Sequence, residues 1–211
     1  LGTIAAGQPI LAIEDKEFYS HMGVKPTAFI RATLVNILSL DFSQGGSTIT
    51  QQVVKNSLLT SEKLISRKLK EWVLAIKLEQ VMSKDEILSM YLNEIPYGGV
   101  IYGVEEASEA FFGKKSKDVT LVEAAYLAAL PKAPTFYSPY GKNKDKLEER
   151  KNLVLKEMLR SNFINQKEYD SAIAEKVSFI AKGDSSIKAP HFVFYVINYI
   201  KEKYGEEIIN S

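Results

Sequence analysis

The chain has 211 residues, of which 45% are hydrophobic and 25% are charged, as expected for one globular domain or one domain with an extension. Its 27 basic and 26 acidic residues leave a net charge of +1, which excludes the broad basic field of a nucleic-acid-binding protein. With no cysteine and two histidines, the chain lacks the ligands for a disulfide framework, a thiolate metal site or a multi-histidine metal site.

Hydrophobic periodicity predicts a mostly helical chain, and four capping boxes mark helix starts. The predicted helices cover residues 25–39, 48–57, 61–81, 84–93, 103–111, 120–129, 144–160 and 166–175. The capping boxes are Thr48-x-x-Gln51, Ser83-x-x-Glu86, Thr120-x-x-Glu123 and Asn165-x-x-Glu168. Short strands are compatible with the residues near Leu11 and Ile180. Clusters of glycine and proline predict loops at 41–46, 97–100 and 131–143.

Composition predicts a boundary near the C-terminus. Residues 182–186, KGDSS, are typical of a linker, and the aromatic-rich APHFVFYVINYIKEKYG that follows indicates the start of another module. We therefore expect one domain over 1–181, and a linker with the beginning of a truncated module over 182–211. No apolar run is long enough to span a membrane, and no basic segment precedes the first apolar stretch as in a signal peptide.

Two carboxylates follow an apolar segment in AIEDKEFYSHMG, residues 12–23. Glu14 and Asp15 lie directly after Ile10–Ile13, and a carboxylate beside apolar surface is suited to act as a general base. An acidic first turn that favours a helix dipole explains the same residues equally well. His21 is interpreted as a structural hydrogen-bonding residue or as a partner of such a base.

The stretch QGGSTITQQVVKN, residues 44–56, places two glycines before a helix start. Such a start presents backbone N–H groups to an anion, although the Walker spacing is absent. Thr48, Gln52 and Lys55 are spaced i, i+4 and i+7 and share one helix face, which is either a binding surface or simply a solvated polar side.

A third charged group lies in RKLKEWVLAIKLEQ, residues 67–80. Arg67 and Lys68 precede Glu71 by four and three residues, so the three are expected on one helix face. They form either a surface ion-pair group or an acid–base site that also holds an anion. The buried side of this helix is predicted to consist of Leu69, Trp72, Val73 and Ile76.

In their order, these stretches, followed by KDEILSMYLNE and YGGVIYGVEEA, resemble the motifs of the peptidoglycan glycosyltransferases, glycosyltransferase family 51. This family forms the polymerising domain of class A penicillin-binding proteins. The resemblance runs from about residue 9 to 139 and more loosely to 177. It implies a mainly α fold with a lysozyme-like helical lobe and a small membrane-associated jaw at about 24–45. The apolar stretch around 29–42 is expected either in the membrane interface or in the core.

By this resemblance, the enzyme polymerises lipid II into β-1,4-linked glycan strands, with inversion and release of undecaprenyl pyrophosphate. Glu14 matches the catalytic base and Glu71 the second essential carboxylate. The resemblance further implies a group of substrate-binding residues, namely Asp15, Thr48, Gln52, Lys55, Asn56, Arg67 and Lys68. No organic cofactor is expected, no metal ligand is assigned, and Mg²⁺ or Mn²⁺ is compatible with a pyrophosphate leaving group.

The resemblance also implies the surroundings. The expected partners are lipid II, the growing glycan strand and the membrane surface, but not nucleic acid. The expected place is the extracytoplasmic face of the bacterial cell membrane, with an N-terminal anchor outside this chain and a fused transpeptidase domain.

Two alternative functions are a muramidase-type glycan hydrolase and a catalytically silent membrane-binding module. The cationic residues argue against the hydrolase, which has no pyrophosphate to neutralise, and the two glutamates argue against the silent module. Moenomycin, which mimics the lipid-linked donor, separates polymerase from hydrolase.

Overall fold

The computed structural model describes residues 2–25, 46–58, 65–181 and 199. The chain divides into two compact units, Leu1–Phe179 and Ile180–Ser211, and the second is described only at residues 180, 181 and 199. The fold below is that of the first unit. The predicted jaw and the predicted helix at 25–39 lie almost wholly outside the described residues, and the module predicted after residue 182 stays a prediction.

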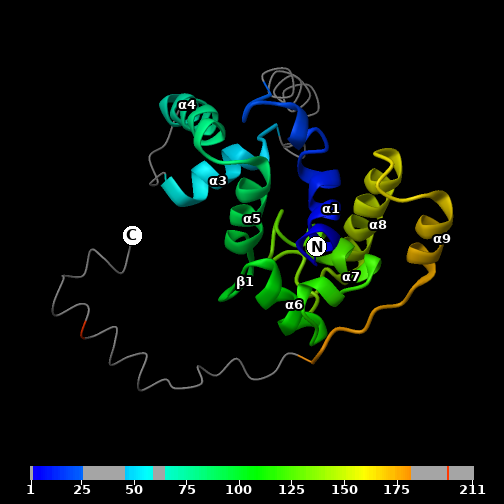
Figure 1. Cartoon of the computed structure of the whole chain (residues 1–211). Helices are drawn as coiled ribbons and strands as arrows, with labels where there is room; N and C mark the ends of the chain where they lie inside the picture. Colours follow the sequence, from blue (N-terminus) through cyan, green and yellow to red (C-terminus); the bar gives the residue numbers. More distant parts are fainter. Residues whose placement is uncertain (1, 26–45, 59–64, 182–198, 200–211) are drawn as a thin grey trace. The chain divides into compact units, whose positions relative to one another are not determined.

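Figure 1 shows that the first unit consists mostly of helices, which confirms the predicted mainly α fold. The elements in chain order are α1 (Gly2–Glu14), η1 (Phe18–Ser20), α3 (Ile49–Leu58), α4 (Ile65–Val81), α5 (Lys84–Glu94), β1 (Pro96–Gly98), β2 (Ile101–Tyr102), α6 (Val104–Phe112), η2 (Ser116–Asp118), α7 (Leu121–Ala129), α8 (Lys144–Arg160) and α9 (Gln166–Ala174). Among these described helices, none is long and apolar enough to cross a membrane.

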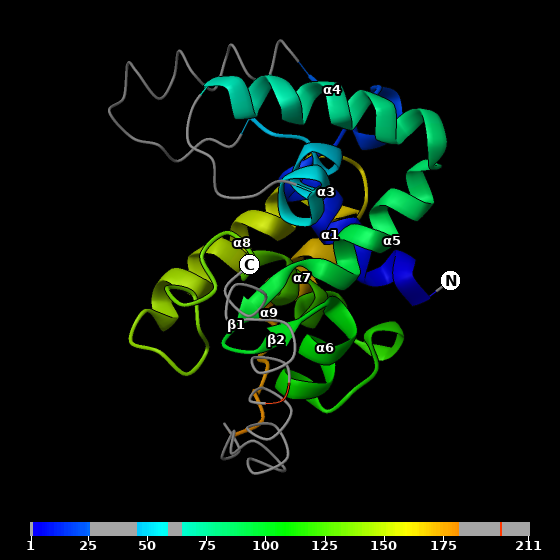
Figure 2. The same ribbon diagram turned by 90° about the vertical axis from the view of Figure 1, so that its left-hand side faces the viewer.

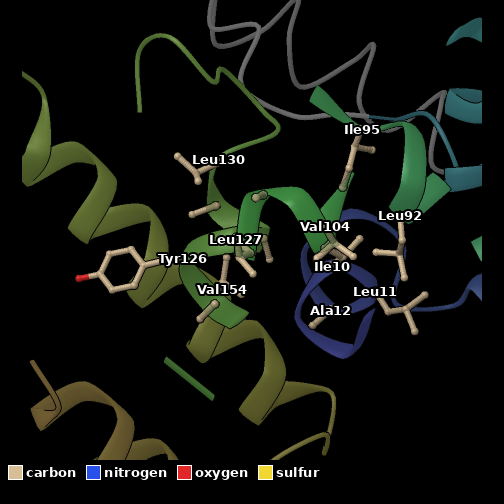
Figure 3. Packing of buried hydrophobic residues seen from close by; sticks show 14 of the residues in the cluster. Ile10, Leu11, Ala12, Leu92, Ile95, Val104, Tyr126, Leu127, Leu130 and Val154 are labelled. Atoms are coloured by element: carbon tan, nitrogen blue, oxygen red, sulfur yellow. The ribbon is translucent and has the colours of Figure 1, made fainter. Parts of the chain in front are cut away.

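Helix α1 lies at the centre of the packing. It contacts α7, α8 and α5, while α3 packs against α4 and α5 (Figures 1 and 2). Figure 3 shows Ile10 and Leu11 of α1 among buried side chains of α5, α6, α7 and α8. Removing such apolar side chains from water stabilises the fold by about 1.5–3 kcal/mol each. This packing fixes the position of α1, and with it the position of its C-terminal residue Glu14.

The position of α1 corrects the prediction of a short strand near Leu11, which lies inside the helix. Pro9 stands within α1 and removes one backbone hydrogen bond, which costs about 3 kcal/mol in a helix interior. Packing against three other helices outweighs this cost, and sequence periodicity does not report such packing. The strand considered near Ile180 is also wrong, since that residue has no regular structure.

The helix starts agree with the predicted caps. Capping boxes are present at Ser83, Thr120 and Asn165, where each side chain accepts from the third helical N–H and a glutamate bonds back. At Thr48 the hydroxyl accepts from the Gln51 N–H at 3.1 Å, and Gln51 accepts from the Thr48 N–H at 2.9 Å. Four local sequence patterns therefore fix where four helices begin.

The predicted loop at 97–100 is instead the turn of a small hairpin. Strands β1 and β2 pair antiparallel, with Pro96 opposite Tyr102 and Gly98 opposite Ile101. The hairpin returns to α5 at Gly103, which has φ +81°, and a Cβ there would lie 2.7 Å from the Asn93 carbonyl oxygen. Only glycine fits this approach, so the hairpin stays against the end of α5.

Helix α4 buries a different face from the predicted one. Leu69, Val73 and Ile76 are 61%, 54% and 37% exposed, whereas Glu71 and Ala75 are buried. The predicted buried side is therefore wrong for these three residues, whereas the fourth, Trp72, is half-buried. A hydrophobic stripe usually faces the core, but in α4 Glu71 is buried instead, beside Arg67 and Lys68.

Candidate active site

Glu14 ends α1 with its side chain 22% exposed, so it is accessible from solvent yet held by neighbours. Gln52 of α3 donates from Nε2 to Glu14 Oε2 at 3.0 Å. On the other side, Arg150 Nη2 of α8 lies 3.7 Å from Glu14 Oε1. Each carboxylate oxygen thus faces one donor, and the carboxylate stays accessible to solvent, as a general base requires.

Asp15, the next residue, faces away from solvent and is 4% exposed. Its Oδ2 accepts from the Ile49 N–H of α3 at 3.1 Å and from His21 Nε2 at 2.8 Å, and Lys25 Nζ lies 3.7 Å from Oδ1. A buried carboxylate at the first N–H groups of a helix is favourable electrostatically. Asp15 therefore holds the start of α3 against the end of α1.

His21 has an assignable tautomer. The Gly23 N–H donates to His21 Nδ1 at 3.1 Å, so Nδ1 is an acceptor and the ring proton lies on Nε2, which donates to Asp15. Gly23 itself has φ +83°, and a Cβ there would lie 2.7 Å from the Ala75 carbonyl oxygen of α4. The interpretation of His21 as a hydrogen-bonding residue that supports the carboxylates is consistent with this geometry.

Thr48 is buried at the N-terminus of α3, with 2% of its surface exposed. Its hydroxyl donates to the Gly23 carbonyl oxygen at 2.5 Å, in addition to the cap contacts with Gln51. The polar atoms of Thr48 thus serve the attachment of α3. Its predicted contact with substrate stays a prediction, as does that of Asp15.

Glu71 is 2% exposed and lies between two cations, which confirms that the three charged residues share a helix face. Lys68 Nζ lies 2.6 Å from Glu71 Oε2, and Arg67 Nε lies 3.4 Å from Oε1. Lys68 also donates to Ser47 Oγ at 2.8 Å. The Arg67 and Lys68 side chains keep 36% and 30% of their surface exposed, so both remain available to an anion.

Segment Ser47–Ile49 joins the two groups of charges. Lys68 contacts Ser47 at one end, and Asp15 accepts from Ile49 at the other. Beyond it, α3 carries Gln52 against Glu14, and then the exposed Lys55 and Asn56. Asn56 borders an open hollow of about 670 Å³ that is lined by Asn56, Asn93, Glu94, Pro96 and Tyr102.

Two residues of the site were missed from sequence. Arg150 is 9% exposed, its Nε donates to the Ala129 carbonyl oxygen at 3.1 Å, and it lies over the Tyr137 ring. Burial lowers the pKa of the Arg150 guanidinium, and the Glu14 carboxylate opposes that shift. The second is Tyr91 of α5, whose hydroxyl lies 3.3 Å from Gln52 Oε1. For Arg150 a signal existed, because it occupies the apolar stripe of α8.

The donor set for a metal ion is sparse. In the described ranges, no three side chains of the His, Asp or Glu type gather as they would around a protein-held cation. The predicted Mg²⁺ or Mn²⁺ stays a prediction.

Comparison with known proteins identifies the family. Residues 5–159 match the family profile described as Transglycosylase. The chain belongs to the transglycosylase family. This transglycosylase is 42% identical over 196 residues to penicillin-binding protein 1A of Aquifex aeolicus (strain VF5), across 93% of the chain and 27% of that protein. It is also 42% identical over 201 residues to penicillin-binding protein 1A of Vibrio cholerae serotype O1, across 95% of the chain and 24% of that protein.

Among solved structures, a crystal structure of penicillin-binding protein 1A from Haemophilus influenzae matches 75% of the chain and 20% of its own, with 30% identity and a TM-score of 0.47. The transglycosylase spans about a quarter of the length of these curated relatives. Family membership confirms that the chain is a transglycosylase, which agrees with the predicted class of enzyme.

Proposed function

We propose that this transglycosylase domain polymerises lipid II, with the growing glycan as donor and lipid II as acceptor. One observation supports the proposal most strongly. The short segment Ser47–Ile49 connects the solvent-accessible carboxylate of Glu14 with the cations Arg67 and Lys68. Asp15, next to Glu14, accepts from Ile49, and Lys68 donates to Ser47. A base for a sugar hydroxyl and a holder for a pyrophosphate are the two functions that such a transfer requires.

Glu14 acts as the base in this proposal. Its carboxylate takes the proton of the acceptor's 4-hydroxyl, and that oxygen forms a bond to the anomeric carbon of the donor. The bond from the anomeric carbon to the pyrophosphate oxygen breaks, and the pyrophosphate leaves with the bonding electrons. Attack opposite the leaving group inverts the configuration and gives the β-1,4 linkage.

Arg67, Lys68 and Lys55 neutralise the leaving pyrophosphate in the proposal. Pyrophosphate leaves readily once its charge is balanced, so cations serve this step better than a second proton donor. Glu71, held by Arg67 and Lys68, fixes the positions of those cations. A divalent ion that takes part would be held mainly by the phosphate oxygens of the substrate, given the sparse protein ligands.

The hollow beside Asn56 is assigned to the glycan. Its amides, carboxylate and tyrosine supply hydrogen-bond donors and acceptors, and a ring such as that of Tyr102 packs well on a sugar face. We also retain as proposals the membrane surface as a partner, the extracytoplasmic face of the cell membrane as the place of action, and a fused transpeptidase domain. The greater length of the relatives supports the last.

The proposal is tested by incubating the chain with lipid II in detergent and analysing products. Polymerised glycan and free undecaprenyl pyrophosphate are expected. Lys68→Ala should lower kcat/KM by about 100-fold, the scale of losing one group that stabilises developing charge. The matched control is Lys146→Ala on α8, whose exposed side chain pairs only with Glu149 in the described structure. A folded parent that leaves lipid II unchanged, or cleaves finished glycan, contradicts the proposal.

A further inference from the structure

Gln52 contacts the carboxylate of Glu14 directly, and this contact has a direction. A glutamine amide has one donating end and one accepting end, which can exchange by rotation about its last bond. With Nε2 3.0 Å from Glu14 Oε2, the amide donates to the carboxylate. In the reversed orientation, a carbonyl oxygen would face a carboxylate oxygen, and both accept only. A group that donates to the carbonyl end of the amide would hold it further in this donating orientation.

Tyr91 is that group. Its hydroxyl lies 3.3 Å from Gln52 Oε1, and the residue is 2% exposed. Burial, and next the nearby Glu14 carboxylate, raises the pKa of Tyr91 well above its ordinary value, so the phenol keeps its proton. A protonated phenol donates to the carbonyl end of the amide, which leaves the NH₂ end for Glu14.

We propose that Tyr91 and Gln52 are positioning residues that hold the Glu14 carboxylate for proton transfer. This inference rests on the proposed function, and it changes the role expected of Gln52 from substrate contact to support of the base. Tyr91 acts only through Gln52, whereas Gln52 acts on the base itself. The Tyr91–Gln52 pair thus links α5, α3 and α1 at the reacting group.

The proposal predicts a particular kinetic signature. Tyr91→Phe removes one oxygen and keeps the ring, so kcat should fall about tenfold while KM stays within about twofold, the scale of one hydrogen bond. Gln52→Leu should lower kcat further. A loss of kcat with an unchanged KM is the signature of a misplaced reacting group and not of weakened substrate binding.

Tyr97→Phe is the matched control. Tyr97 is also 2% exposed and lies three residues beyond the end of α5, but its hydroxyl has no hydrogen-bond partner in the described structure. Its removal should leave kcat and KM unchanged. If Tyr91→Phe behaves like Tyr97→Phe, or raises KM with an unchanged kcat, the positioning role is wrong.

A second readout does not need turnover. The side-chain amide resonances of Gln52, assigned by their loss in Gln52→Leu, should shift in Glu14→Gln, which changes the partner of the amide. In Tyr91→Phe the two amide protons should move toward each other as the amide gains rotational freedom, and in Tyr97→Phe they should not. Unchanged Gln52 resonances in Tyr91→Phe overturn the inference even in an inert chain. Inactivity of the parent with the expected amide shifts contradicts only the proposed function.

Discussion

Asp15 shows how one buried carboxylate positions the site. It accepts from Ile49 and His21, and it is next to the proposed base. Because these contacts replace water around a buried carboxylate, Asp15→Asn should lower the free energy of unfolding by about 1.5–3 kcal/mol, the range for hydrogen bonds to charged groups. Denaturant titration measures this change. Glu149→Gln, on an exposed residue paired with Lys146, should leave the titration unchanged. Equal curves for both variants would show that Asp15 does not hold α3.

Some residues of the site could be predicted from the sequence, and others could not. The charged motif residues were predicted, and so was the shared face of Arg67, Lys68 and Glu71. Arg150, which contacts Glu14, and Tyr91, which contacts Gln52, were not, because they come from α8 and α5, far away in sequence. No local pattern joins such residues, and only the packing of helices around α1 brings them to one point.

At the scale of elements, α8 illustrates a signal that was available. Its buried stripe follows helical spacing and includes two cations, and its members are Leu147, Arg150, Lys151, Val154, Leu155 and Met158. A cation within an apolar stripe needs a partner once it is buried. Arg150 has Glu14, and Lys151 Nζ lies 2.6 Å from Glu148 Oε1. Periodicity alone could thus have indicated two functional or structural ion pairs on this helix.

The Lys151–Glu148 pair gives a stability prediction. Lys151 is fully buried, so Glu148→Gln leaves a buried ammonium without its counter-charge and should lower the free energy of unfolding by about 2 kcal/mol. This is less than for a wholly buried pair, because the Glu148 side chain is 49% exposed. The adjacent Glu149→Gln, on an exposed pair with Lys146, is the control for the same denaturant titration and should have no effect.

The same pair predicts a pH dependence. Partial burial raises the pKa of Glu148, but the Lys151 ammonium and the Tyr126 hydroxyl lower it by more, so the pKa lies below its ordinary value of 4.5. A lowered folded-state pKa means that the stabilisation is complete above about pH 4.5 and is lost as pH falls through the folded-state value. The difference in stability between parent and Glu148→Gln should therefore shrink in acid. A difference that stays constant down to pH 3 would contradict this account.

Helices α1 and α4 show why other elements were not predictable. Pro9 and two glycines argue against a helix, yet α1 forms because α5, α7 and α8 surround it. In α4, Leu69, Val73 and Ile76 suggested a core face, but the helix packs against α3 with Glu71 and Ala75 buried instead. In both elements, tertiary contacts outweigh the local pattern.

At the scale of the whole molecule, the aromatic cluster at the end of the first unit sets its boundary. Phe179 packs on Phe112 and Tyr126, with ring centroids 5.3 and 5.1 Å apart. A chain shortened after residue 181 keeps this cluster, so its thermal unfolding midpoint should match that of the full chain. A chain shortened after residue 177 loses Phe179 and should unfold at a lower temperature. Equal midpoints for the two shortened chains would show that the cluster contributes nothing.

The central claim is that Glu14 is the base of a lipid II polymerase, and one comparison tests it most directly. Rates of glycan formation from lipid II are measured for the parent, Glu14→Gln and the exposed control Glu149→Gln, each shown to be folded by its thermal unfolding midpoint. We predict parent-like rates for Glu149→Gln and a loss of about 100-fold or more for Glu14→Gln, the scale of removing a general base. A folded Glu14→Gln variant that polymerises at the parent rate would contradict the account.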